Sequence, residues 1–177
     1  VGREIFFNYL KKLWLGKKTG IELAWEEEWF IEPVATVSLA RFLKNSFWLG
    51  MRATPIQIAT SYASIINGGY LVKPTIIEKI YDKQAEEMIE NQTKIVRKVF
   101  KNSTTEKIKS ALFDVIHTNE FNNETIAVEW YSLGGKSGTS EITYKGRYQT
   151  QWRWWTNASF IGIVTKENLK YLVTVQV

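Results

Sequence analysis

The chain has 177 residues, no cysteine, one histidine and a formal net charge of +5. Hydrophobic residues make up 45% of it, which is enough for one domain with a buried core and too many for a disordered chain. The lack of cysteine excludes disulfide scaffolds, thiolate metal sites and cysteine nucleophiles. The single histidine, His117, argues against a histidine-based triad or metal site and is expected at a helix end or on the surface. We therefore expect neither metal nor cofactor.

The positive charge does not form a long basic stripe. Lysines gather over residues 11–18, but Glu26, Glu27 and Glu28 follow closely, so a solvated mixed-charge surface is favoured over nucleic-acid binding. No stretch approaches the roughly 18 apolar residues of a membrane span. The N-terminus has no signal-peptide pattern, and the chain stops within a predicted strand. Both ends are therefore expected to be cut from a longer domain.

Three helices are predicted from apolar periodicity and capping signals. The first covers residues 3–15 and is expected to end at Gly16. Thr54-Pro55 predicts an N-cap followed by proline at the first helical position, and Asn67-Gly68-Gly69 predicts the end of that helix. Ser103-Thr104-Thr105-Glu106 has capping-box spacing and predicts the start of the third helix.

Strands dominate the second half of the chain. Helices come first and strands close the sequence, which is an α+β order with an antiparallel sheet. The last three strands are joined by short turns and predict an antiparallel meander. The extended or strand segments are residues 70–74, 76–81, 93–100, 133–143, 158–164 and 169–177.

The run Lys136-Ser137-Gly138-Thr139 is the most informative motif. On a strand, alternate residues face the same side, so Ser137 and Thr139 present two hydroxyls together. Gly138 permits the close approach of a backbone or ligand, and Lys136 adds a positive charge. The motif could hold a carboxylate-bearing peptide along a strand edge.

The order of the motifs resembles the penicillin-binding transpeptidase domain, especially the class B type that cross-links peptidoglycan. The resemblance implies one α+β domain of the serine transpeptidase/β-lactamase-like fold, truncated at both ends. Its parts would be a mainly helical region (1–70), strands and a helix (71–132) and the sheet strands (133–177). The segments that carry it are residues 7–12, 16–23, 53–59, 62–63, 67–69, 73–74, 135–139 and 158–162.

The resemblance also implies roles for the motif in acyl transfer. Lys136 would supply charge and hydrogen bonding at the centre of the site. The Ser137 and Thr139 hydroxyls would bind the carboxylate of a D-Ala-D-Ala stem peptide or a β-lactam. The backbone N–H of Thr139 would be an oxyanion donor, and Gly138 would keep the strand open to the acyl chain. The parent protein would be anchored at the extracytoplasmic membrane face, with a membrane glycosyltransferase and cell-wall proteins as partners.

The family's nucleophile is missing from the sequence. No Ser-x-x-Lys and no Ser-x-Asn occurs in the 177 residues, so the chain alone is expected to be inactive. Two alternatives to a transpeptidase remain open. One is a hydrolytic relative, such as a DD-carboxypeptidase or β-lactamase. The other is a non-catalytic module that senses or binds stem peptide or β-lactam.

Eight tryptophans are many for this length. The family pattern has glycine where this chain has Trp14, Trp25, Trp29, Trp48, Trp130 and Trp154, whereas Trp155 fits as tryptophan and Trp152 is undecided. Some bacteria read the UGA codon as glycine, and another common code reads it as tryptophan. We hypothesise that most of these residues are glycines translated with the wrong code. Ordinary core tryptophans, or a sugar-stacking platform at residues 152–155, are the alternatives.

Overall fold

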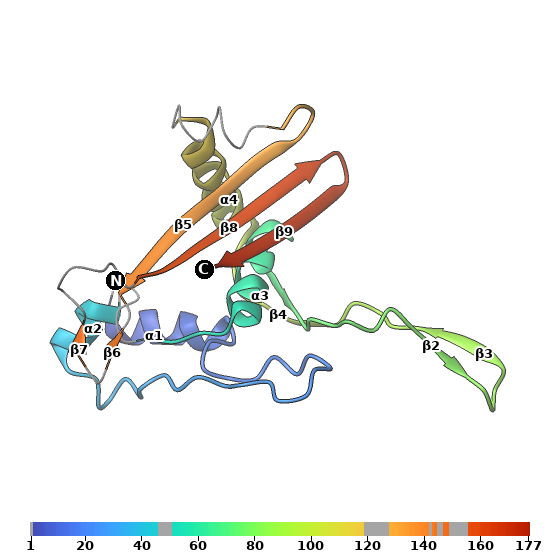
Figure 1. Ribbon diagram of the computed structural model, residues 1–177, viewed down its shortest axis with the longest axis horizontal. Coiled ribbons are helices and arrows are strands. Elements are labelled where there is room, and N and C mark those ends of the chain that lie inside the picture. Colours follow the sequence, from blue (N-terminus) through green and yellow to red (C-terminus); the bar gives the residue numbers. More distant parts are fainter. Residues whose placement is uncertain (1, 46–50, 119–127, 142, 145–146, 149–155) are drawn as a thin grey trace.

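A computed structural model describes residues 2–45, 51–118, 128–141, 143–144, 147–148 and 156–177, and Figure 1 shows its arrangement. Helical segments precede the main antiparallel sheet, as the α+β prediction requires. The elements are α1 (Arg3–Lys12), α2 (Leu39–Asn45), α3 (Pro55–Ile66), β1 (Tyr70–Val72), β2 (Lys79–Asp82), β3 (Glu87–Glu90), β4 (Ile95–Lys98), α4 (Asn102–His117), β5 (Ser132–Glu141), β6 (Thr143–Tyr144), β7 (Arg147–Tyr148), β8 (Thr156–Lys166) and β9 (Leu169–Gln176).

The predicted antiparallel meander is confirmed as a three-stranded sheet with the order β5-β8-β9. The sequence predicts a short turn or hairpin loop at residues 145–147 between the first two of these strands. The structure has a short β6-β7 pair there, with Arg147 in β7, and residues 145–146 lie outside the described residues. One face of the sheet packs against α3 and α4 (Figure 1). Ile66 from α3, Leu112 from α4 and Ile163 from β8 form the buried centre of this contact.

Helix α3 begins as the sequence predicts. The Thr54 hydroxyl accepts a hydrogen bond from the backbone N–H of Gln57, and the Gln57 side chain accepts one from the N–H of Thr54. Both contacts satisfy donors that the first helical turn would otherwise leave unpaired. The fully buried Gln57 also donates to the carbonyl oxygen of Lys17 at 2.7 Å, so one side chain joins the helix start to the loop after α1.

Two predicted helix boundaries are wrong. Helix α1 ends at Lys12 rather than at residue 15, because the chain turns into the left-handed region at Trp14, two residues before Gly16. Helix α4 begins at Asn102 with Lys101 as its N-cap, so Ser103 lies inside the first turn and forms no capping box. The N–H groups of Thr104 and Thr105 instead bond to the carbonyl oxygen of Lys101.

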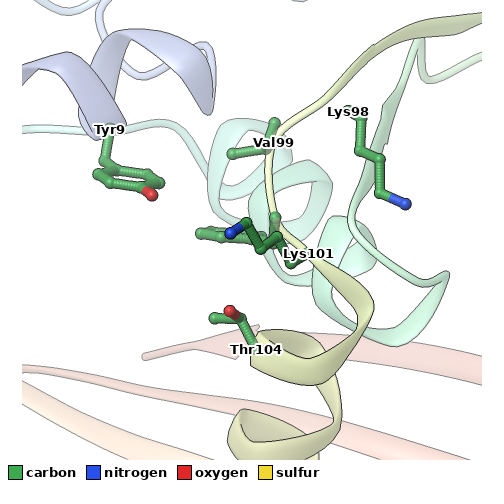
Figure 2. Close-up of a pocket in the computed structure, with 6 residues that line it drawn as sticks. Tyr9, Lys98, Val99, Lys101 and Thr104 are labelled. Atoms are coloured by element: carbon green, nitrogen blue, oxygen red, sulfur yellow. The ribbon is translucent and has the colours of Figure 1, made fainter.

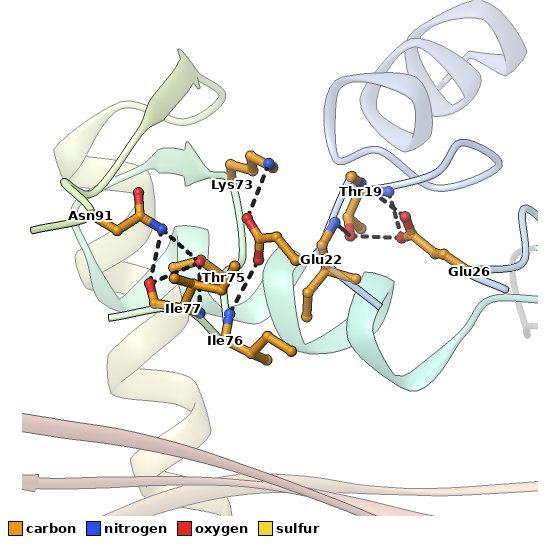
Figure 3. Close-up of polar contacts among 10 residues, drawn as sticks. Thr19, Glu22, Glu26, Lys73, Thr75, Ile76, Ile77 and Asn91 are labelled. Atoms are coloured by element: carbon orange, nitrogen blue, oxygen red, sulfur yellow. Dashed lines mark hydrogen bonds and ion pairs between the residues drawn. The ribbon is translucent and has the colours of Figure 1, made fainter. Parts of the chain in front are cut away.

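A hairpin of β2 and β3 projects away from the rest of the molecule (Figure 1). Its base is fastened to the loop that follows α1, as Figure 3 shows. The Glu22 carboxylate accepts hydrogen bonds from the Lys73 ammonium at 3.3 Å and from the backbone N–H of Ile76 at 3.2 Å. The pKa of Glu22 is lowered, most strongly by a hydrogen bond from its own backbone N–H. Desolvation opposes this shift, but hydrogen bonds from Ile76, Thr75 and Lys73 lower the pKa further. Glu22 therefore sets the direction in which the hairpin leaves the body.

A second carboxylate shapes the same loop (Figure 3). Glu26 accepts hydrogen bonds from the hydroxyl and the backbone N–H of Thr19 and from the N–H of Gly20, at 2.6 to 2.9 Å. Desolvation alone would raise the pKa of Glu26, but the hydrogen bonds from Thr19 and Gly20 and the charge of Lys18 outweigh it and lower the pKa. Among the described residues, no helix is long and apolar enough to cross a membrane.

Candidate active site along strand β5

Strand β5 is an edge strand of the main sheet. Within the described parts of the chain it pairs with β8 and with no other strand. Lys136 and Gly138 lie opposite Ile161 and Ser159 and share one face, whereas Ser137 and Thr139 share the other face. All four are exposed, so a ligand at this edge can reach side chains from both faces.

The hydrogen bonds of the neighbouring strands show which way the Thr139 backbone points. Ala158 lies opposite Thr139, and its N–H and C=O both bond to Val177, at 3.0 and 2.8 Å. In an antiparallel ladder the N–H and C=O of one residue point to the same side. The backbone N–H and C=O of Ala158 therefore point away from β5, so Thr139 and Ala158 are a pair without hydrogen bonds between them. The N–H of Thr139 points outward from the free edge.

Lys136 reaches the same edge from its own face. Its ammonium donates a hydrogen bond to the carbonyl oxygen of Ser137 at 2.8 Å. Ser137, two residues from Thr139, also has an outward-facing backbone in this ladder. The contact therefore places a positive charge beside the outward N–H of Thr139. An ammonium has three donors, and this is the one hydrogen bond that Lys136 makes to a described residue. The other donors can serve a ligand.

Glycine at position 138 leaves room for the Ser159 hydroxyl. A Cβ atom there would lie 2.8 Å from the Ser159 hydroxyl oxygen, which donates a weak hydrogen bond to the Gly138 carbonyl at 3.4 Å. Two earlier glycines allow other close contacts. A Cβ at Gly134 would lie 3.2 Å from the backbone of α4, and one at Gly135 would lie 2.7 Å from the Ile161 carbonyl oxygen.

A cavity of about 530 Å³ lies between this strand and the start of α3. Residues 136–140 form one side of it, together with polar side chains of β8 and β9, among them Ser159 and Thr174. The Thr174 hydroxyl oxygen is buried and has no hydrogen-bond partner in the part of the chain that the structure describes, so a polar group inside the cavity could satisfy it. Burial raises the pKa of Tyr62, which contributes to the opposite wall.

Sequence reasoning missed a second cation of this cavity. Arg52 lines it and lies over the Trp29 ring, with 5.1 Å between the guanidinium carbon and the ring centroid. No motif signalled Arg52. Ser159, by contrast, could have been found by aligning the predicted strands 133–143 and 158–164 in antiparallel register. Among the described residues, the lining contains no histidine and no carboxylate, so Lys136, Arg52 and Tyr62 are its titratable groups.

A separate cavity of about 440 Å³ lies between α1 and the start of α4 (Figure 2). Tyr9 and Phe100 stack at its wall with ring centroids 5.8 Å apart, and Lys98, Lys101 and Thr104 also line it. It shares no residue with the β5 cavity and contains none of the motif residues. In the described part of the chain, no group of three or more acidic, histidine or cysteine residues could hold a metal ion.

Known proteins resemble the whole chain. The model of the penicillin binding protein transpeptidase domain matches residues 1–177. Stage V sporulation protein D of Bacillus subtilis is 30% identical over 178 residues, which is 100% of this chain and 27% of that protein. The peptidoglycan D,D-transpeptidase FtsI homolog of Mesostigma viride is 28% identical and is matched over 96% of this chain and 30% of that protein. The chain thus spans less than a third of these relatives.

Solved structures share its fold. Penicillin binding protein 3 of Mycobacterium tuberculosis, in its apo form, has a TM-score of 0.87 at 24% identity, over 100% of this chain and 40% of that chain. Penicillin binding protein 2X of Streptococcus thermophilus has a TM-score of 0.86 at 21% identity, over 99% and 26% of the two chains. The α+β transpeptidase fold is confirmed, and the chain belongs to the penicillin-binding protein transpeptidase-domain family.

Proposed function

We propose that the chain forms the carboxylate-binding and oxyanion-binding wall of a peptidoglycan DD-transpeptidase. The observation that carries this proposal is the outward N–H of Thr139 beside the ammonium of Lys136 on a free strand edge. An extended peptide can lie along such an edge and bond to its backbone. A backbone N–H aimed at the developing oxyanion stabilises the transition state of acyl transfer.

Each motif residue has a separate role. Lys136 attracts the substrate carboxylate and supports hydrogen bonding at the centre of the site, and the Ser137 and Thr139 hydroxyls bind the carboxylate. The Thr139 N–H binds the oxyanion, and Gly138 leaves the strand open. The preferred substrate is a stem peptide that ends in D-Ala-D-Ala, and β-lactams compete with it. Relatives of this fold have been solved in complex with aztreonam and ampicillin, which supports β-lactam binding here.

The nucleophile would come from another part of the parent protein. The 177 residues contain no Ser-x-x-Lys and no Ser-x-Asn, so we propose that the chain alone does not form an acyl-enzyme. The parent acts at the extracytoplasmic face of the cell membrane, with a membrane glycosyltransferase and cell-wall proteins as its partners. These statements concern the whole protein and rest on family membership.

Labelling with a fluorescent penicillin tests the proposal. The full-length parent should be labelled covalently and the 177-residue chain should not. Lys136→Ala in the parent should slow labelling about 100-fold. Lys107→Ala is a matched control, since Lys107 is an exposed lysine of α4 that does not line the β5 cavity. An unlabelled parent that still binds penicillin reversibly would instead identify a non-catalytic binding module.

Product analysis separates transfer from hydrolysis. With a stem peptide and an amine acceptor, the parent should release D-alanine and form a cross-linked dimer. Release of D-alanine without a dimer would identify a DD-carboxypeptidase, and rapid turnover of the penicillin label would identify a β-lactamase. Thr139→Val removes the hydroxyl and keeps the backbone N–H, so it should weaken substrate binding more than it lowers the maximal rate.

A further inference from the structure

Three of the four tryptophans that the structure describes have left-handed backbones. Their φ angles are 65° at Trp14, 65° at Trp25 and 72° at Trp130. An L-residue with a large side chain is strained there, because its Cβ crowds the following carbonyl oxygen, whereas glycine has no Cβ. The fourth, Trp29, has no such angle.

Trp14 occupies the position after a helix where glycine is most favoured. The N–H of Trp14 bonds to the Lys11 carbonyl at 3.2 Å, and the N–H of Leu15 bonds to the Leu10 carbonyl at 3.1 Å. This pair of bonds, with Leu13 as the C-cap, defines a Schellman motif whose left-handed residue is Trp14. The buried Leu10 and Leu15 share one core cluster, the apolar contact that accompanies this motif.

Trp130 and Trp25 occupy turns. The N–H of Tyr131 bonds to the Val128 carbonyl at 3.2 Å, so residues 128–131 form a β-turn with Trp130 third. Glu129 does not have a positive φ, so this is a type II turn, which requires glycine or asparagine at its third position. Trp25 lies in the turn that it forms with Ala24.

The indole rings of the two turn residues give little packing in return for this strain. Trp25 is 93% exposed and Trp130 is 78% exposed, so neither is a core residue. Glu86 and Glu167 also have positive φ, but both lie in turns that join paired strands. A positive φ alone therefore does not identify a missing glycine. An aromatic residue with this backbone at three glycine-preferring positions, two of them with highly exposed rings, does.

We propose that the natural protein has glycine at positions 14, 25 and 130. The codons at these positions are UGA, which the source organism reads as glycine. Translation with a code that reads UGA as tryptophan gives the tryptophans of the printed sequence. This inference is independent of the proposed function. It does not extend to Trp29, where the backbone gives no reason for glycine. Trp48 and Trp154 lie outside the described residues.

The gene and the natural protein give the direct test. We expect UGA at codons 14, 25 and 130, and peptides from the protein isolated from its source should carry the mass of glycine at these positions. UGG codons, or peptides with tryptophan masses, would overturn the inference. Peptide masses are needed as well as codons, because a UGA codon does not show which residue its organism inserts.

A stability measurement tests the backbone argument separately. In the full-length parent, Trp→Gly and Trp→Ala are compared at positions 14, 25 and 130. The glycine variant should have an unfolding equilibrium constant about fivefold lower per site than the alanine variant, because only alanine retains the left-handed strain. Trp29→Gly is the matched control and should raise that constant. Equal constants for the glycine and alanine variants would contradict the backbone argument.

Discussion

Substitution of Gly69 by alanine should be among the most destabilising single changes in this domain. Gly69 follows α3 with a φ of +97° and lies against the segment that enters α4. A Cβ atom there would clash with the Phe100 carbonyl oxygen and would lie 2.9 Å from its carbonyl carbon. These are backbone atoms, so no side-chain rotation relieves the clash. The Gly69 carbonyl also accepts the N–H of Val99 at 2.7 Å, which holds the two segments together.

The expected cost follows from these contacts. The left-handed backbone costs alanine about 1 kcal/mol relative to glycine. Displacing the Phe100 backbone costs about 1–3 kcal/mol as overpacking, and weakening the Val99 hydrogen bond costs about 1 kcal/mol more. Gly69→Ala should therefore destabilise the protein by about 3–5 kcal/mol. Gly68→Ala is the matched control, because its φ is +86° but its nearest neighbour is the Asn102 amide oxygen, 4.0 Å away. It should cost about 1 kcal/mol.

Urea unfolding of the full-length parent, followed by far-ultraviolet circular dichroism, measures both variants. Gly69→Ala should lower the midpoint about three times as much as Gly68→Ala, with an unchanged slope. Equal shifts of the midpoint would refute the reasoning. The cost of placing alanine in a left-handed backbone would then explain both variants, and the clash with the Phe100 backbone would add nothing at Gly69.

Three further predictions concern the supports of the site. Gln57→Ala should cost about 2–3 kcal/mol in urea unfolding, since it removes the capping contact and leaves the Lys17 carbonyl unpaired. Gln57→Glu should cost at least as much, because it buries a carboxylate and sets it against the Lys17 carbonyl oxygen. Folding lowers the pKa of Glu26. The carboxylate therefore stabilises the folded protein at pH values above the ordinary carboxyl pKa, and this stabilisation is lost as the pH falls through the lowered pKa. Glu26→Gln should flatten the acid side of a stability-against-pH curve, and an unchanged curve would exclude this role. Gly138→Ala should slow penicillin labelling of the parent. Adding Ser159→Ala should restore part of the labelling rate, because it removes the hydroxyl oxygen that lies 2.8 Å from the new Cβ. If the double variant is labelled as slowly as Gly138→Ala, this contact is not the cause.

Local signals account for what the sequence predicted correctly. The N-cap of α3 depends on Thr54 and its next three residues, and the glycine pair that ends this helix is equally local. The last two main strands followed from apolar residues between turn residues, and the first from the run at residues 136–139 with its apolar and β-branched flanks. The order of these motifs indicated the family, and the match to the whole chain confirms it. The alternation of Ser137 and Thr139 with Lys136 needed only the two-residue period of a strand.

Long-range contacts decided the rest. Helix α4 begins before Ser103, directly after a segment that the Gly69 carbonyl holds in place by accepting the N–H groups of Val99 and Phe100. The hairpin direction depends on Glu22, more than 50 residues away from Ile76 in the sequence.

The direction of the Thr139 N–H is a further example. The sequence places Thr139 on a strand but does not say which edge its backbone faces. The bonds between Ala158 and Val177 decide this. Because the backbone N–H and C=O of Ala158 both point toward β9, they cannot bond to Thr139 on β5. The placement of the Lys136–Thr139 side chains on the two faces of a strand was therefore predictable from the residues. The orientation of the Thr139 N–H arises only when the third strand of the sheet is in place.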